Sequence, residues 1–168
     1  MAVLEIVTLP NPVLRRKAHK VTEFGTDFRV LVENMIETMR EAPGVGLAAP
    51  QVAVPLRLIV VEYGDDEDEN APKKLYVVAN PEIVERSEET ELGIEGCLSV
   101  PGLIGEVERN LKITVKGQNR QGRPVKIKAQ SWLARIFQHE IDHLDGIVYT
   151  DLTDKVWKPT AEDEIPLD

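Results

Sequence analysis

Two histidines and a glutamate lie close together near residue 140. His139 and His143 are four positions apart, and Glu140 directly follows the first of them. On an α-helix, residues i and i+4 project from one side about one turn apart, so the two imidazoles can bind one metal ion. In this H-E-x-x-H pattern the glutamate is not a ligand but the base toward a metal-bound water. The spacing therefore predicts a metal-dependent hydrolytic site.

The alternative is that these are two surface histidines of an ordinary helix. Their neighbours argue against it, because Ile136, Ile141 and Leu144 make the same segment strongly apolar. Two unpaired imidazoles on such a face would each carry a desolvation cost, which a bound metal would remove. The context therefore favours the metal.

A third ligand has to come from another part of the chain, since catalytic metal sites normally have three protein ligands and one open position. Cys97, in the stretch EGCLS, is the only cysteine. A thiolate with two imidazoles suits Fe²⁺, Zn²⁺, Co²⁺ or Ni²⁺. A lone cysteine is otherwise a small buried apolar residue, and His19 lies in a charged segment where a ligand is not expected. The residues alone leave Cys97 and one of the many carboxylates open.

Two helices and several strands must position these groups. Helical spacing of apolar residues predicts one helix that begins at Thr26, as a capping residue, and ends before Pro43 and Gly44. A second helix, residues 131 to about 145, carries the two histidines. Strands are predicted for five segments, the last two joined by a turn at residues 119–122: 56–63, 75–79, 81–86, 111–116 and 124–129.

The order helix, strands, helix predicts an α+β fold, with mostly antiparallel sheets around a central helix that carries the H-E-x-x-H motif. At 168 residues the chain fits a single catalytic domain over 1–168, with an irregular tail over 151–168. The net charge of −9 argues against direct nucleic-acid binding. No signal peptide or membrane-spanning run is recognisable, which predicts a cytoplasmic protein without membrane contact.

Three segments resemble the three motifs of the peptide deformylase family, in the same order and with fitting spacing. They are GVGLAAPQ at 44–51, EGCLS at 95–99 and QHEIDHLDG at 138–146. The resemblance extends over about residues 9–151. Three motifs together are far more specific than H-E-x-x-H alone.

The resemblance implies a metal-dependent hydrolase that removes the formyl group from the N-formyl-methionyl end of new polypeptides and releases formate. It implies one divalent ion per chain, typically Fe²⁺ in the cell, with Zn²⁺, Ni²⁺ or Co²⁺ also accepted. Water on the metal would attack the formyl carbon, with Glu140 as base and then acid. Gln51 and the backbone N–H of Leu98 would stabilise the oxyanion. The implied metal ligands are Cys97, His139 and His143.

The resemblance also suggests how the substrate is held. An extended peptide would pair with an exposed strand edge near the small Gly44-x-Gly46 stretch, and Trp132, Leu133 and Ile136 would line a methionine pocket or belong to the core. Glu95 would form a structural ion pair with Arg109, or an exposed ion pair that contributes little to stability. The substrate-binding candidates are Gly44, Val45, Gly46, Glu95, Gly96, Trp132, Arg135 and Ile136.

Two features depart from some members of the family. No basic residue follows the second motif, so Arg135 is the candidate for a charge contact with substrate. The acidic tail does not resemble a basic ribosome-docking helix, which leaves a transient ribosome contact open. Two competing functions remain: a metallopeptidase, whose third ligand is usually His or Glu, and a binding module with a structural metal closed by four ligands.

Overall fold

The computed structural model describes residues 2–64, 70 and 72–160. Within these ranges the strands form a five-stranded sheet, in the order β1-β2-β3-β6-β7, and a three-stranded sheet, in the order β4-β5-β8. All neighbouring strands are antiparallel. The strand bounds are β1 Gly46–Ala48, β2 Leu58–Tyr63, β3 Lys74–Arg86, β4 Thr90–Cys97, β5 Val100–Asn110, β6 Lys112–Gln118, β7 Pro124–Gln130 and β8 Val156–Trp157.

The two α-helices, α1 (Thr26–Glu41) and α2 (Ser131–Leu144), pack on opposite faces of the five-stranded sheet. Strand β2 contributes side chains to the contacts with both helices, because successive side chains of a strand point to opposite faces. Ile59 and Val61 belong to the apolar cluster beneath α2, whereas Leu58 and Val60 belong to the cluster beneath α1. A strand buried on both faces needs a continuous apolar run, and residues 58–61 supply it.

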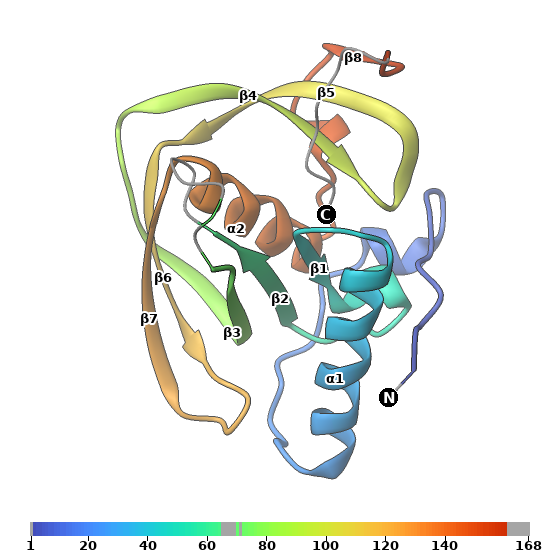
Figure 1. Ribbon diagram of the computed structural model, residues 1–168, viewed down its shortest axis with the longest axis vertical. Coiled ribbons are helices and arrows are strands. Elements are labelled where there is room, and N and C mark those ends of the chain that lie inside the picture. The colour runs from blue at the N-terminus through green and yellow to red at the C-terminus, as the bar shows by residue number, and fades with distance from the viewer. Residues whose placement is uncertain (1, 65–69, 71, 161–168) are drawn as a thin grey trace.

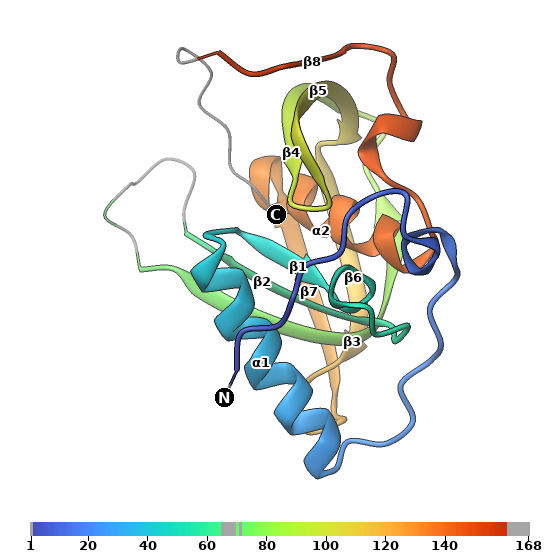
Figure 2. The same cartoon turned by 90° about the vertical axis from the view of Figure 1, so that its right-hand side faces the viewer.

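Helix α2 lies between the two sheets, with the β4–β5 hairpin arching over it (Figures 1 and 2). Ala134, Phe137, Ile141 and Leu144 form its contact with the five-stranded sheet. Gly146 follows the helix with φ of +77°, the left-handed conformation that ends helices favourably at glycine. The opposite side of the helix, where His139 and His143 lie, therefore faces the hairpin.

A two-residue turn, Leu98 and Ser99, joins β4 to β5. Cys97 is the last residue of β4 and pairs with Val100 across this turn. The turn thus fixes Cys97 at the end of a hairpin that leans on α2. Among the described strands, β1 and β4 are each at the edge of their sheet.

The α+β fold, with antiparallel sheets around a central helix, is confirmed, and the second helix begins and ends close to its predicted bounds. Thr26 is the first residue of α1 and not its cap, which is Gly25. The predicted strands 75–79 and 81–86 are one strand, β3, whose pairing is interrupted where Asn80 takes a φ of +52°. Strands β1, β4, β5 and β8 were not predicted from the sequence.

Within the described ranges, no helix combines the length and the apolar character that crossing a bilayer requires. The tail predicted over 151–168 is described only in part. Residues 151–160 contain the short strand β8, and residues 161–168 lie outside the described residues.

Candidate metal centre and active site

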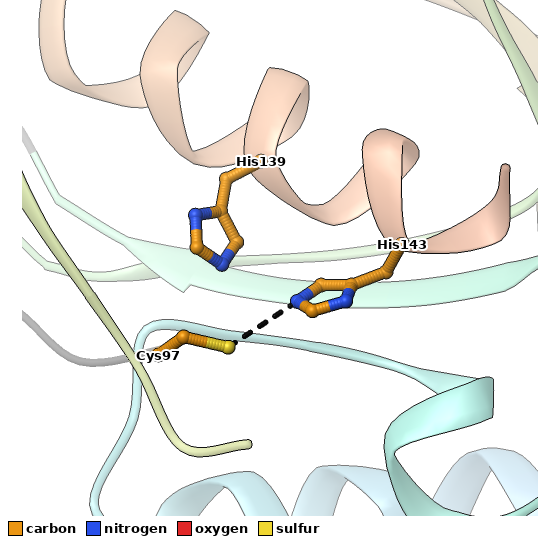
Figure 3. Close-up of side chains that lie close together, drawn as sticks. All are labelled: Cys97, His139 and His143. Carbon is orange, nitrogen blue, oxygen red and sulfur yellow. Dashed lines mark hydrogen bonds between the residues drawn. The ribbon is translucent and has the colours of Figure 1, made fainter. Parts of the chain in front are cut away.

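Cys97, His139 and His143 lie close together, as Figure 3 shows, and all three are buried. One ligand atom from each residue lies within 4.8 Å of the others. The Cys97 Sγ atom is 3.4 Å from Nε2 of His143, and the two imidazole ring centroids are 5.1 Å apart. The i, i+4 spacing on α2 brings the imidazoles together, and the β4–β5 turn brings the sulfur to them. One soft and two borderline donors in this arrangement fit a divalent transition metal.

Glu95 fixes the orientation of the first histidine. Its Oε1 atom is 2.8 Å from Nδ1 of His139, and both side chains are buried. A carboxylate on Nδ1 leaves Nε2 as the ring nitrogen available to a metal, which is the arrangement that orients most metal-binding histidines. The donor set therefore fits the ion that the family resemblance implies.

Two arginines surround the same carboxylate. Arg109 donates Nε to Oε2 and Nη2 to Oε1, each at 2.8 Å, and Arg135 donates Nη1 to Oε2 at 2.7 Å. Burial alone would raise the pKa of Glu95, but the hydrogen bonds and charges of Arg109 and His139 outweigh it and hold that pKa far below its usual range. Glu95 is therefore an anion that accepts bonds from three side chains, and its predicted pair with Arg109 is confirmed and buried.

Gln51 lies against the sulfur with its amide orientation fixed. Its Oε1 atom accepts a hydrogen bond from the backbone N–H of Ala48 at 3.0 Å, so its amino group must point the other way. Nε2 donates to Ser99 Oγ at 3.2 Å and lies 3.7 Å from Cys97 Sγ. The fully buried side chain thus directs its N–H groups toward the metal position. Ser99 was not foreseen from the sequence, although it lies two residues after Cys97.

Glu140 is fully buried beside β1. A Cβ atom on Gly46 would lie 2.6 Å from Glu140 Oε2, so the carboxylate occupies the space where any other residue at position 46 would have its side chain. This contact gives Gly46 a role in placing Glu140.

A small cavity of about 20 Å³ lies next to His139 and Glu140. Six of the eight predicted substrate-binding residues line it: Val45, Glu95, Gly96, Trp132, Arg135 and Ile136. Gly44 and Gly46 are not among the residues that line it, and Gly46 lies against Glu140. Leu133 packs against the core cluster beneath α2 instead of the cavity.

The sequence and the fold both have close relatives. The family model described as "Polypeptide deformylase" matches residues 3–158. The chain belongs to the peptide deformylase family. It is 52% identical to the peptide deformylase of Symbiobacterium thermophilum over 97% of this chain and 72% of that protein. The peptide deformylase of Natranaerobius thermophilus is 49% identical over 94% of this chain and 97% of its own.

Solved structures of peptide deformylases have the same fold. The crystal structure of the Legionella pneumophila enzyme superposes with a TM-score of 0.82, at 40% identity, over 90% of this chain and 86% of that one. A Met-Ala-Ser-bound peptide deformylase from Acinetobacter baumannii gives 0.83 at 39% identity, over 90% and 98% of the two chains. Family membership makes the chain a hydrolase of the formyl amide and decides against the metallopeptidase.

Several contacts around the deformylase motifs could not be seen in the sequence. The bond from His139 to Glu95 is one, since it depends on how β4 lies across α2. The ion pair of Asp142 with Arg109, at 2.6 Å, is another. The ring of Tyr149 stacks on His139 with centroids 6.1 Å apart. Asp142 alone among them carried a signal in the sequence, because it lies within the third motif, between His139 and His143.

Proposed function

We propose that this chain removes the formyl group from the N-formyl-methionyl end of newly made polypeptides and releases formate. The observation that carries the proposal is the buried Cys97–His139–His143 cluster, with its ligand atoms within 4.8 Å of one another, beside Glu140 and Gln51. A related structure from A. baumannii, 39% identical, is described as bound to Met-Ala-Ser, which is the product that formyl-Met-Ala-Ser would leave.

The proposed metal ligands are Cys97 Sγ and one imidazole nitrogen each from His139 and His143, with Fe²⁺ as the ion in the cell and Zn²⁺, Ni²⁺ or Co²⁺ as alternatives. Such an ion would polarise the formyl carbonyl and lower the pKa of a bound water. Three ligands leave a position open, which separates this proposal from a structural site closed by four.

The groups around the cluster would transfer protons and stabilise the developing negative charge. Glu140 takes the proton from the attacking water and passes it to the leaving nitrogen. Gln51 Nε2 and the backbone N–H of Leu98 donate to the formyl oxygen as negative charge develops on it. The amide of Gln51 needs little reorganisation for this, because Ala48 already fixes its orientation.

The substrate backbone would lie extended between β1 and β4, which are edge strands in the described part of the chain and where Gly46 and Gly96 present little side chain. Its methionine would enter the cavity beside Val45, Trp132 and Ile136. That cavity has room for about one water molecule, so its lining would have to move to admit the side chain.

We further propose that residues 1–168 form one catalytic domain that acts in the cytoplasm, where formylated polypeptides are made. Its macromolecular partners would be the nascent chains and, transiently, the ribosome. A spin-down of the chain with translating ribosomes, with and without high salt, tests this contact.

The deciding experiment measures formate release from formyl-Met-Ala-Ser, with metal content read on the same sample under anaerobic conditions. Glu140→Gln should keep the metal and lose turnover, because it removes only the proton acceptor. Cys97→Ala should lose the metal itself. Formate release by Glu140→Gln, or full metal occupancy in Cys97→Ala, would contradict the mechanism.

A further inference from the structure

Arg135 lies on α2, one turn before His139, with only 4% of its surface exposed. Its guanidinium donates Nη1 to Glu95 Oε2 at 2.7 Å and to the carbonyl of Val107 at 2.8 Å. Its Nη2 donates to the carbonyl of Glu91 at 2.7 Å. All three acceptors belong to the protein, so the guanidinium uses these hydrogen bonds to hold β4 and β5. That argues against Arg135 as a charge contact for the substrate.

Trp132 and Gly93 also lie beside the guanidinium of Arg135. The guanidinium carbon lies 5.4 Å from the ring centroid of Trp132, a cation–π contact. On the other side, a Cβ atom on Gly93 would lie 2.7 Å from Cζ of Arg135. Glycine at position 93 therefore makes the space through which Arg135 reaches Glu95.

The two oxygens of Glu95 have different partners. Oε1 accepts from His139 and Arg109, whereas Oε2 accepts from Arg109 and Arg135. Arg109 alone could hold the carboxylate as a planar pair. Arg135, which lines the cavity together with Glu95, adds a further bond to Oε2.

We propose that Arg135 is a positioning residue, which fixes Glu95 and through it the ring of His139 from the wall of the cavity. The inference rests on the proposed metal site but not on the substrate. Partners that hold a metal-binding histidine typically contribute about 10- to 100-fold to metal affinity. Loss of Arg135 should therefore weaken metal binding even when no substrate is present.

The test is a Co²⁺ titration of the metal-free protein against a competing chelator, followed by the absorption of the Co²⁺–thiolate form. Arg135→Met should lower the Co²⁺ affinity by about 10-fold, the lower end of that range, because Arg109 still holds Glu95, and it should shift the absorption. Arg135→Lys should recover part of the affinity, because an ammonium can replace one bond to Glu95. Arg29→Met, which removes an exposed cation of α1, should match the parent protein.

Trp132→Leu is the matched control for the cavity wall. It removes the ring beside the guanidinium but none of the three polar contacts of Arg135, so it should raise the KM for formyl-Met-Ala-Ser and leave Co²⁺ affinity within about twofold. If Arg135→Met behaves in the same way, Arg135 is a cavity wall only and the proposal is overturned.

Gly93→Ala provides a second route if Arg135→Met does not fold. The new methyl group would displace the guanidinium without removing it, since the nearest atom is the end of a flexible side chain. It should reproduce the loss of Co²⁺ affinity, and unchanged affinity would overturn the proposal. A parent protein that binds no Co²⁺ would overturn the metal site and this role together, whereas binding without formate release would contradict only the proposed reaction.

Discussion

Gly46 on β1 lies directly against Glu140 on α2: a Cβ atom on the glycine would be 2.6 Å from Oε2 and 3.0 Å from Cγ and Cδ of the glutamate. The first and third motifs of the sequence thus meet at one contact. The missing side chain at position 46 allows Glu140, the proposed general base, to lie beside the edge strand β1, where we propose that the substrate binds.

Gly46→Ala should therefore act on catalysis more than on stability. The methyl group would push the Glu140 carboxylate, which can turn, and not the backbone. General acid–base catalysis contributes about 10²- to 10⁴-fold, and we expect kcat for formyl-Met-Ala-Ser to fall by about 10²-fold or more while metal content stays unchanged. Gly25→Ala is the matched control, because nothing lies within 4 Å of its Cβ position. A Gly46→Ala enzyme with the parent kcat would contradict this role.

The parts of the fold that the sequence predicts are those in which local pattern and packing agree. Strand β2 is buried on both faces, so its apolar run is continuous. The hairpin β4–β5 was missed because Gly93, Gly96, Gly102 and Gly105 dilute its strand pattern. Two of these glycines have long-range causes, because Cβ atoms at 93 and 105 would collide with Arg135 and Tyr149, whereas Gly102 has a local one, its φ of +80°. Contacts of this kind are not visible in a single sequence.

The metal and active site likewise combines features set by local spacing with features set by long-range contacts. Helical spacing alone places His139 and His143 together, because it depends only on α2. The position of Cys97 beside them requires the β4–β5 turn, and its prediction as a ligand rests on the family resemblance. The contact between Glu95 and His139 depends on how two distant elements cross, so residue spacing could not predict it.

Gln51→Ala should lower kcat without a matching loss of substrate binding. The Gln51 N–H groups are directed toward the sulfur at 3.7 Å and away from Ala48, so their main benefit comes when the formyl oxygen becomes negative. Removal of one such donor typically costs about 10²- to 10³-fold in kcat. Steady-state kinetics at fixed metal content measures the loss. An increase in KM with an unchanged kcat would mean that Gln51 only binds the ground state.

Glu62 on β2 and Arg40 on α1 predict an acid-dependent contribution to stability. Arg40 donates Nε at 3.0 Å and Nη2 at 2.7 Å to the carboxylate. That hydrogen bond, and the charge of Arg40, lower the pKa of Glu62 from its ordinary 4.5 against the opposing effect of burial. The pair therefore stabilises the fold fully above about pH 4.5, and this contribution is lost as pH falls through the lowered pKa.

Glu62→Gln should thus be less stable than the parent at pH 7. As the pH falls below about 5, its free energy of unfolding should decrease less steeply than that of the parent. Because 55% of the Arg40 side chain is exposed, solvent screening limits the difference to about 0.5–1 kcal/mol. Urea unfolding of the metal-free protein at several pH values measures it. Glu41→Gln, on an exposed helical carboxylate without an ion pair in the described part of the chain, is the control. Parallel pH curves for parent and Glu62→Gln would refute the assignment.

Arg109 should be the most costly residue of the charged group around Glu95 to lose. It is 6% exposed and bonds to both Glu95 and Asp142. Breaking a buried ion pair by removing one partner costs about 3–5 kcal/mol. Arg135 still bonds to Glu95 in Arg109→Met, so we expect the lower end of this range, about 3 kcal/mol. The measurement is urea unfolding with a chelator present, because bound metal would add stability of its own.

Asp142→Asn is the comparison for Arg109→Met, because it removes only the partly exposed ion pair of Arg109 and keeps the buried one with Glu95. Its carboxylate is 26% exposed, so water can replace part of what Arg109 supplies, and the cost should stay near or below about 1 kcal/mol. The expected ranking is therefore Arg109→Met well above Asp142→Asn. Equal costs would mean that Arg109 stabilises the fold mainly through its partly exposed contact with Asp142, and the buried pair with Glu95 would then serve the orientation of His139 and not the stability of the fold.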